Sequence, residues 1–404
     1  MKKLVLTLPF LFLANLALAS GFALYEFSAR GNAMGGAVMA GEAEPASLAT
    51  NPALITELPG KQMQLGATVV TATGHVVYGG VSQFSERQWW PLPHFYYTQQ
   101  LDDNLWFGVG TFARFGLSND YEDKGWLLPT PTLYHVGVTT YSIQPTVAYK
   151  ATDKLSFALG MEAQYLNFTE KINFGPSKMN LDGDSVAISG IFALFYNVNE
   201  KVNFGANFRL KSNHNVTGPA KYSTEVSSMF VNGGDFWGDI SFPAQLTLGA
   251  SWKATDKLLL EFNWTNVFWS CFDAIDIYFD HAPGAGTPGL MGNHQNNSKK
   301  YQDAYRIGFG AEYILTDAVK LRGSFIFDKS PINKGFMDPM LPVDDRFVFG
   351  TGAGFKLSEN TILDLSYNLL FATRLNGVNA AHTTTVHYGN STSHLMGLSF
   401  RYKF

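Results

Sequence analysis

The stretch SGFALYEFSARGNAMGGAVMAGEAEPASLATNPALITELPG, residues 20–60, decides how the rest of the chain is interpreted. Six glycines and nine alanines fall within it, and side chains this small let a backbone pack closely against its surroundings. Pro45 favours the start of a short helix through Thr50. Asn51 precedes Pro52, which favours the end of that helix. Because no alternating strand pattern runs through the stretch, we expect a compact segment that needs a surrounding wall.

The residues before this stretch have the features of a secretory signal peptide. Two lysines precede an apolar run over residues 4–18, and Ala17 and Ala19 have the spacing of an A-x-A cleavage site. A transmembrane anchor is the alternative, but the run is shorter than the roughly 18 residues that spanning needs, and Pro9 interrupts it. We therefore predict a signal peptide over residues 1–19. Its removal takes the formal net charge from −4 to −6, which gives no support for nucleic acid binding.

Residues 61–404 show no linker, charge block or shift in composition, so they are predicted to form one domain. Cys271 is the only cysteine, which excludes an internal disulfide. Phe, Tyr and Trp make up 15% of the chain, while the mean hydropathy is −0.03. These values fit a closed wall that is apolar on its outer face and polar on its inner face.

A repeat of short polar turns runs through this region and indicates strand pairs. Between successive turns there is room for two strands and one longer connection. The turns are Leu101–Asn104, Ala151–Lys154, Val198–Lys201, Ala254–Lys257, Leu315–Ala318 and Leu357–Asn360.

The segments beside the turns alternate with a period of two, as strands do. Tyr305, Ile307 and Phe309 point to one face, whereas Arg306 and Gly308 point to the other. The same alternation occurs in residues 202–211, 258–264, 346–355 and 396–404.

A soluble sandwich with its apolar face inward is the alternative to a membrane barrel. Strands of ten or more residues, aromatic residues near strand ends, and short turns that alternate with long connections favour a transmembrane β-barrel of the outer membrane. The predicted fold is all-β, with fourteen antiparallel strands. They are expected near residues 61–73, 90–100, 105–116, 137–150, 155–168, 184–197, 202–213, 241–253, 258–270, 301–314, 319–329, 344–356, 361–374 and 391–404.

Several motifs make the chain similar to the FadL/TodX/OmpP1 family of outer-membrane transporters of hydrophobic compounds. The resemblance covers essentially the whole mature chain. The motifs are GFALYEFS at 21–28, NPALIT at 51–56, FGL at 115–117, DAYRI at 303–307, FDKSP at 327–331 and DDRF at 344–347.

The resemblance implies a fourteen-stranded barrel (residues 61–404) that an N-terminal hatch (residues 20–60) plugs. It implies passive uptake of long-chain fatty acids or similar hydrophobic compounds, movement of the hatch, and lateral release through a kink in the third strand. By this resemblance the hatch and gate residues are Phe22, Asn51, Pro52 and Ala53, and the lateral opening lies at Arg114, Phe115 and Gly116.

A fatty acid carries a carboxylate, which an apolar slot holds only beside a cation. Arg306, Arg322 and Arg346 are the candidate ligand-binding residues, because their register points inward. The other charges of the inner face are expected to pair with one another across the barrel. A hydrophobic capture surface is expected in loops at 169–183, 214–240 and 271–300.

No nucleophile motif and no close pair of zinc-ligand histidines stands out, so we predict neither an enzyme nor a metal site, and no cofactor. Expected partners are hydrophobic small molecules, outer-membrane lipid and lipopolysaccharide, with the chain itself a monomer. An importer of aromatic hydrocarbons is the alternative within transport. The alternative to a transporter is a structural or adhesive barrel. A mobile hatch would argue against such a barrel, which has no need of one.

Overall fold

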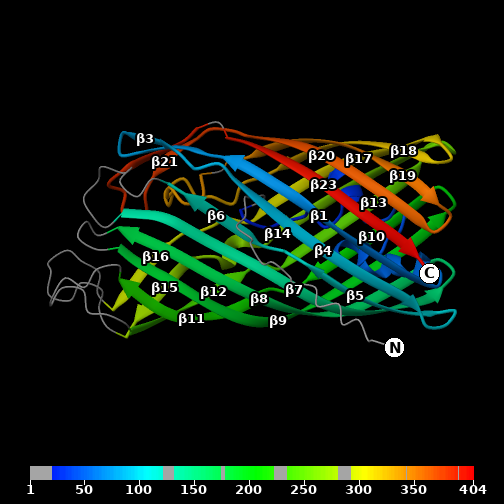
Figure 1. The fold of residues 1–404 in the computed structure, drawn as a ribbon, viewed down its shortest axis with the longest axis horizontal. Helices are drawn as coiled ribbons and strands as arrows, with labels where there is room; N and C mark the ends of the chain where they lie inside the picture. Colours follow the sequence, from blue (N-terminus) through cyan, green and yellow to red (C-terminus); the bar gives the residue numbers. More distant parts are fainter. Residues whose placement is uncertain are drawn as a thin grey trace, which may run out of the picture.

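In the computed structural model the chain is described over residues 21–121, 132–173, 178–222, 234–280, 293–342, 344–389 and 391–404. The predicted signal peptide lies outside the described residues. Strands dominate the fold and wind obliquely around one axis (Figure 1). No helix in the described ranges has both the length and the apolar character to cross a bilayer.

Fourteen antiparallel strands form the wall, and five of them consist of two consecutive pieces. In order around the barrel they are β1 (Lys61–Thr73), β4 (Gln88–Gln100), β5 (Leu105–Phe112) with β6 (Gly116–Asp120), β7 (Thr132–Thr152), β8 (Leu155–Asn173), β9 (Lys178–Asn199), β10 (Val202–Arg209) with β11 (Ser212–Tyr222), β12 (Gly234–Phe242) with β13 (Gln245–Lys253), β14 (Leu258–Val267) with β15 (Ala274–Phe279), β16 (His294–Ser298) with β17 (Ala304–Thr316), β18 (Val319–Asp328), β19 (Arg346–Ser358), β20 (Thr361–Ala372) and β23 (Ser391–Lys403).

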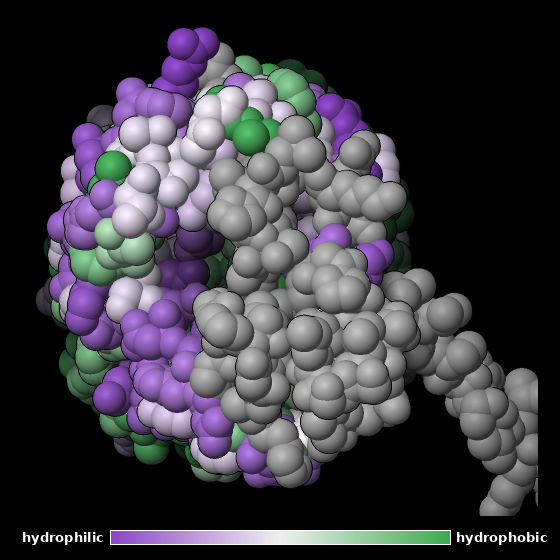
Figure 2. All heavy atoms as spheres, turned by 90° about the vertical axis from the view of Figure 1, so that its left-hand side faces the viewer, coloured by the Kyte–Doolittle hydropathy of each residue, from purple (hydrophilic) through white to green (hydrophobic). Residues whose placement is uncertain are grey.

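The barrel closes where β1 pairs with β23, from Gln62 opposite Lys403 to Thr73 opposite Thr392. The closed barrel and the number of strands confirm the prediction. All six predicted short turns lie at one end, here called the short-turn end, where the C-terminus also lies (Figure 1). At the other end, here called the outer end, the hydrophilic rim is visible in Figure 2.

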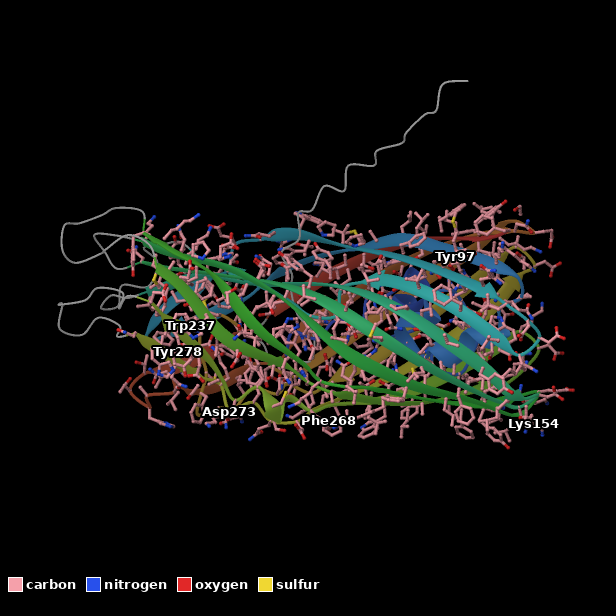
Figure 3. The ribbon with its side chains drawn as sticks, turned by 90° about the horizontal axis from the view of Figure 1, so that it is seen from below. Tyr97, Lys154, Trp237, Phe268, Asp273 and Tyr278 are labelled. Atoms are coloured by element: carbon pink, nitrogen blue, oxygen red, sulfur yellow. The ribbon has the colours of Figure 1, made fainter. Side chains whose placement is uncertain are left out.

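The outward and inward faces alternate as predicted. Phe309 is 51% exposed on the outer face of β17, whereas Arg306 and Gly308 are buried. In Figure 3, Lys154 marks the short-turn end, and Trp237 and Tyr278 lie toward the outer end.

Several strands are longer than expected, and this corrects the prediction of capture loops. Most of residues 169–183 and 214–240 belong to β8, β9, β11 and β12, and part of 271–300 belongs to β15 and β16. Most of their outward side chains are polar, for instance Asp182 and Asn215, although Trp237 and Tyr278 are also exposed. The strands predicted at 155–168, 184–197 and 202–213 are too short, because β8 continues to Asn173, β9 begins at Lys178 and β11 continues to Tyr222. Phe174, Met229, Phe230, Leu290 and Met291, which lie in those predicted loops, fall outside the described residues.

At the outer end, a small four-stranded sheet is built from the connections that flank β1, β4, β20 and β23. Its strands are β2 (His75–Tyr78), β3 (Val81–Phe84), β21 (Leu375–Val378) and β22 (Thr385–Tyr388), in the order β21-β22-β2-β3.

The N-terminal segment, residues 21–60, contains three short helical turns and is almost wholly buried. The turns are α1 (Ala29–Ala33), α2 (Ser47–Thr50) and the 3₁₀ turn η1 (Pro52–Glu57). Only the turn near Pro45 was predicted. Asn51 ends α2 in an extended conformation, and its side chain accepts a hydrogen bond from the backbone N–H of Ala53.

Hydrogen bonds join this segment to strands on different sides of the barrel. The backbone N–H of Ala29 donates to Ser399 of β23, and Arg209 of β10 donates to the carbonyl of Ala49. Arg30 is fully buried between Glu261 of β14, at 3.4 Å, and Glu312 of β17, at 3.3 Å. The segment is therefore fixed by polar contacts as well as by close packing.

Most charged side chains of the inner face pair with one another, as predicted. Glu162 lies 2.8 Å from Arg114 and 3.1 Å from Arg209. Arg322 lies 2.7 Å from Glu312 and 2.6 Å from Asp364. Leaving one such charge buried and unpaired is strongly unfavourable, so the pairs constrain one another.

Replacing Phe309 with arginine tests the outward face. Phe309 lies in the middle of β17 on the side predicted to face lipid, so the variant should lose about 2–4 kcal/mol of unfolding free energy. The measurement is reversible denaturant unfolding in lipid bilayers.

Leu315→Arg is the matched control, because Leu315 is 50% exposed on the same face of β17 but lies at the short-turn end. It should cost about 0–1 kcal/mol. Equal losses for the two variants would contradict the placement of Phe309 in the lipid-facing belt.

Candidate functional site

The third strand of the barrel is interrupted between β5 and β6. Every residue from Phe112 to Asn119 is buried, so both alternating faces of this stretch are covered. A wall strand has one face toward lipid, and therefore this stretch bends inward. Sequence analysis predicted the interruption at Arg114, Phe115 and Gly116.

Residues 22–24 of the N-terminal segment pair with the interrupted strand. Ala23 lies opposite Phe115 in an isolated antiparallel bridge. The backbone N–H of Leu24 donates to the carbonyl of Arg114 at 2.7 Å, and the N–H of Gly116 donates to the carbonyl of Phe22 at 2.9 Å. The segment thus takes the place of a neighbouring strand at the interruption. The structure brings Phe22 together with all three residues predicted for the lateral opening.

Side chains of β7 and β8 support the interruption from the other side. The Thr140 hydroxyl accepts hydrogen bonds from the backbone N–H groups of Arg114 and Phe115, at 3.3 and 3.0 Å. It donates to the carbonyl of Phe115 at 2.8 Å. Arg114 itself is held by its ion pair with Glu162.

Between β4 and β6 the wall has no backbone ladder among the described residues. Pairing of β4 with β5 runs from Gln100 only as far as Phe95, which lies opposite Thr111. At the outer end, the backbone N–H of Glu86 donates to the carbonyl of Asp120 at 2.9 Å. We call the stretch between these two points, bordered by residues 88–94 of β4 and by β6, the unpaired seam.

Two prolines keep the β4 edge of this seam from pairing. The ladder between β1 and β4 is continuous through Pro91 and Pro93, which lie opposite Val69 and Ala67. Proline fits a ladder only where the missing N–H would point away from the partner strand. The two missing donors therefore belong to the edge that borders the seam.

An aromatic cluster surrounds Phe22 next to the interrupted third strand. Its ring centroid lies 4.7 Å from that of Trp269, 5.3 Å from Phe272 and 5.8 Å from Phe242. Phe115 stacks on Phe242 at 4.3 Å. These contacts bury Phe22 completely.

A largely apolar cavity lies beyond Phe22, toward the outer end of the barrel. We call it the outer cavity. Its apolar lining includes Phe22, Leu117, Val138, Ile240, Phe272 and Met340, and its charged lining residues are Glu170, Lys299 and Asp338. Phe22 therefore borders the outer cavity on one side and the strand interruption on the other.

The three arginines predicted to bind a ligand differ in their partners. Arg322 and Arg346 are already paired with carboxylates; Arg346 lies 2.9 Å from Asp328. Arg306 has no carboxylate within 4 Å among the described residues, and its guanidinium lies 4.0 Å from the ring centroid of Tyr25. It lines a second, smaller cavity together with Leu24, Tyr25 and Arg209. Of the three, Arg306 is the one without an ion pair among the described residues.

Asn51, Pro52 and Ala53 lie in a different part of the barrel from Phe22. The Asn51 amide donates to the carbonyls of Met39 at 2.7 Å and Leu194 at 3.0 Å. Leu194 belongs to β9, so this motif fixes the base of the N-terminal segment to the wall. It does not join the aromatic cluster around Phe22.

Sequence analysis missed Phe242, Trp269 and Thr140, as well as Glu170 with its neighbours. The interruptions of strand alternation at Pro243 and at Trp269–Cys271 were visible signals for the first two. Among the described residues, no group of three or more His, Cys, Asp or Glu side chains is placed to hold a metal ion.

Comparison with known proteins places these features in context. The family described as outer membrane protein transport protein (OMPP1/FadL/TodX) matches residues 10–404. The chain is 24% identical to outer membrane protein P1 of Haemophilus influenzae over the full length of both chains. It is 21% identical to the long-chain fatty acid transport protein of Escherichia coli K12, over 91% of each. Its fold is similar to that of a FadL homologue of Pseudomonas aeruginosa, with a TM-score of 0.81, 15% identity, and coverage of 95% of this chain and 100% of the other.

Thr140→Val tests the support of the strand interruption. The change leaves two buried N–H groups and one carbonyl without their partner, so the unfolding free energy should fall by about 1–3 kcal/mol. Thr71→Val is the matched control, because the buried Thr71 hydroxyl has no hydrogen-bond partner in the described structure. Denaturant unfolding of both variants makes the comparison, and equal stability of the two would show that Thr140 does not hold the interruption.

Proposed function

We propose that this chain, which belongs to the OMPP1/FadL/TodX family of outer membrane transport proteins, takes up long-chain fatty acids or similar hydrophobic compounds passively and releases them sideways into the bilayer. Family members are transport channels and not enzymes, and the chain is an outer-membrane protein. The observation that carries the proposal is the pairing of residues 22–24 with the interrupted third strand.

Capture takes place in the outer cavity. A hydrophobic molecule crosses the polar lipopolysaccharide layer poorly, and an apolar cavity toward the outer end offers it a favourable place. Since Phe22 is part of the cavity lining, the ligand touches the gate as soon as it is bound.

The gate is the N-terminal stretch from Phe22 to Leu24. Opening it breaks two backbone hydrogen bonds and the aromatic contacts of Phe22. A ligand that replaces those aromatic contacts shifts the equilibrium toward the open form by its preference for that form. Gly21, with a φ of 66°, lies next to this stretch and provides a backbone conformation that other residues rarely adopt.

Release occurs through the unpaired seam. Leu24 packs in one cluster with Trp90 and Leu92 of β4 and with Ala113, so its displacement uncovers apolar side chains on both sides of the seam. An apolar molecule can then pass into the hydrocarbon layer without entering the periplasmic water.

The remainder of residues 20–60 acts as the hatch domain in this proposal, and residues 61–404 as the barrel domain. The ion pairs of Arg30 and the Asn51 hydrogen bonds hold the hatch in place while residues 22–24 move. Because the rest of the hatch stays in place, only residues 22–24 need to move when the gate opens.

Two observations support a fatty acid as the proposed substrate. The Escherichia coli relative is named a long-chain fatty acid transport protein, and Arg306 is the inward arginine left without a carboxylate partner among the described residues. An aromatic hydrocarbon is the alternative substrate. It would leave Arg306 without a function in binding.

The surroundings of the barrel supply its other partners. The outward belt contacts outer-membrane lipid, and the polar outward faces of the strands near the outer end meet lipopolysaccharide. Because the single chain closes its own barrel through β1 and β23, we propose that it works as a monomer.

A disulfide between Ala23→Cys and Phe115→Cys, in a Cys271→Ala background, tests the gate. These residues lie opposite each other in an antiparallel bridge, at a separation that a disulfide spans. The oxidised protein should bind a radiolabelled fatty acid but fail to take it up, whereas the reduced protein should do both.

Thr73→Cys with Thr392→Cys is the matched control, because it ties β1 to β23 without touching the gate. Oxidation of this pair should leave uptake unchanged. Unimpaired uptake by the oxidised A23C/F115C variant, with its crosslink verified, would rule out this gate.

Arg306→Gln tests the substrate class. If Arg306 meets the carboxylate, the variant should bind oleate about 10- to 100-fold more weakly, because a charge-assisted hydrogen bond is lost. Binding of a neutral hydrocarbon should stay the same. Arg87→Gln, on the exposed surface, removes the same charge and serves as the control. Equal binding of oleate by both variants would favour a neutral substrate.

A further inference from the structure

The outer cavity contains one buried polar atom that lacks a partner. Glu170 lies on β8, is 2% exposed and lines the cavity. Its carboxyl oxygen Oε1 has no hydrogen-bond partner among the described residues. Buried polar atoms are nearly always satisfied in folded proteins, so an unsatisfied one inside a cavity marks a place for a missing group.

The other charged residues of the cavity do not fill this role. The ammonium group of Lys299 lies 2.5 Å from Asp338 and is neutralised by it. The cavity therefore holds two carboxyl groups and one ammonium group. A ligand with an anionic head would meet an excess of carboxyl groups, and Lys299, the cation among the described lining residues, is already paired.

We propose that Glu170 accepts a hydrogen bond from the hydroxyl group of an otherwise apolar ligand. The outer cavity then takes uncharged molecules with a single hydroxyl donor, such as an alkanol or a protonated carboxylic acid. The apolar body of the ligand packs against Val138, Ile240 and Met340. A carboxyl group offers an acceptor oxygen whether or not it carries a proton, so the recognition does not depend on the state of Glu170.

This inference rests on the proposed function, since it names the class of compound bound at the capture site. It adds a selection step that precedes the gate. Molecules of one chain length are sorted by the group they carry before the gate opens, and Arg306 acts only deeper in the barrel.

The test compares binding of decane, 1-decanol and decanoate at pH 8 to the Arg306→Gln protein, which serves as the parent so that the deeper arginine does not bind decanoate; the probes are radiolabelled and protein-free micelles are subtracted. The parent protein should bind 1-decanol about tenfold more tightly than decane, because one hydrogen bond is gained, and more tightly than decanoate. Glu170→Leu should lower 1-decanol binding to the level of decane and leave decane unchanged.

Two further variants keep the test decisive. Glu170→Gln retains a carbonyl oxygen that accepts a hydrogen bond, so it should preserve the preference for 1-decanol. Leu133→Trp narrows the outer cavity and should weaken all three probes, which shows that they bind there. Heat-modifiable electrophoretic mobility confirms that each variant is folded.

The inference is overturned if folded Glu170→Leu keeps the preference for 1-decanol, or if the parent binds decanoate more tightly than 1-decanol. It is also overturned if Leu133→Trp binds 1-decanol normally. If the parent binds none of the probes, the proposed function itself fails. If decane binds and is taken up but 1-decanol has no advantage, only the inference about Glu170 fails.

Discussion

The hydrogen bonds between residues 22–24 and the interrupted third strand are the interaction on which the rest of this structure depends. A barrel wall in lipid must satisfy its backbone groups internally, because no water is present to do so. The inward bend at Arg114 and Phe115 removes these residues from the ladder with β4. Phe22 and Leu24 supply part of the lost pairing and Thr140 supplies the rest. These contacts satisfy the backbone groups at the interruption. They can also be broken and formed again, because residues 22–24 are not part of the wall.

The barrel interior contains two regions that are held by different kinds of contact. Below the interruption, ion pairs such as those of Arg30 and Arg322 connect the N-terminal segment and the wall strands into a single charged network. Phe22 is held by aromatic and other apolar contacts and by backbone hydrogen bonds. Apolar contacts can be exchanged for those of an apolar ligand at little cost, whereas a buried ion pair cannot be exchanged in that way. The region held by ion pairs is thus the one we propose to stay fixed, and the region around Phe22 is the one we propose to move.

The sequence predicted the wall well and the interior poorly, for a physical reason. Strand alternation is local, so the outward position of Phe309 and the inward position of Arg306 follow from their neighbours in the chain. The resemblance to a known family also identified Phe22 and Arg114–Gly116, and the structure brings these residues together. The contacts of Thr140 and Glu170 depend on which strands lie side by side and on the shape of a cavity, and no local pattern carries that information. The lengths of β8, β9 and β11 were underestimated because their outward faces become polar toward the outer end while the strands continue.

Photolabelling with an apolar diazirine probe during uptake tests the lateral route most directly, because it marks the residues along the path. The account predicts labelling of the outer cavity and of both sides of the unpaired seam, at Trp90 and Leu92 of β4 and Leu117 of β6. It predicts little labelling at the short-turn end around Glu42 and Lys253, which line a separate polar cavity. Labelling at Glu42 and Lys253, with Trp90, Leu92 and Leu117 unmarked, would contradict the lateral route and indicate passage straight through the barrel.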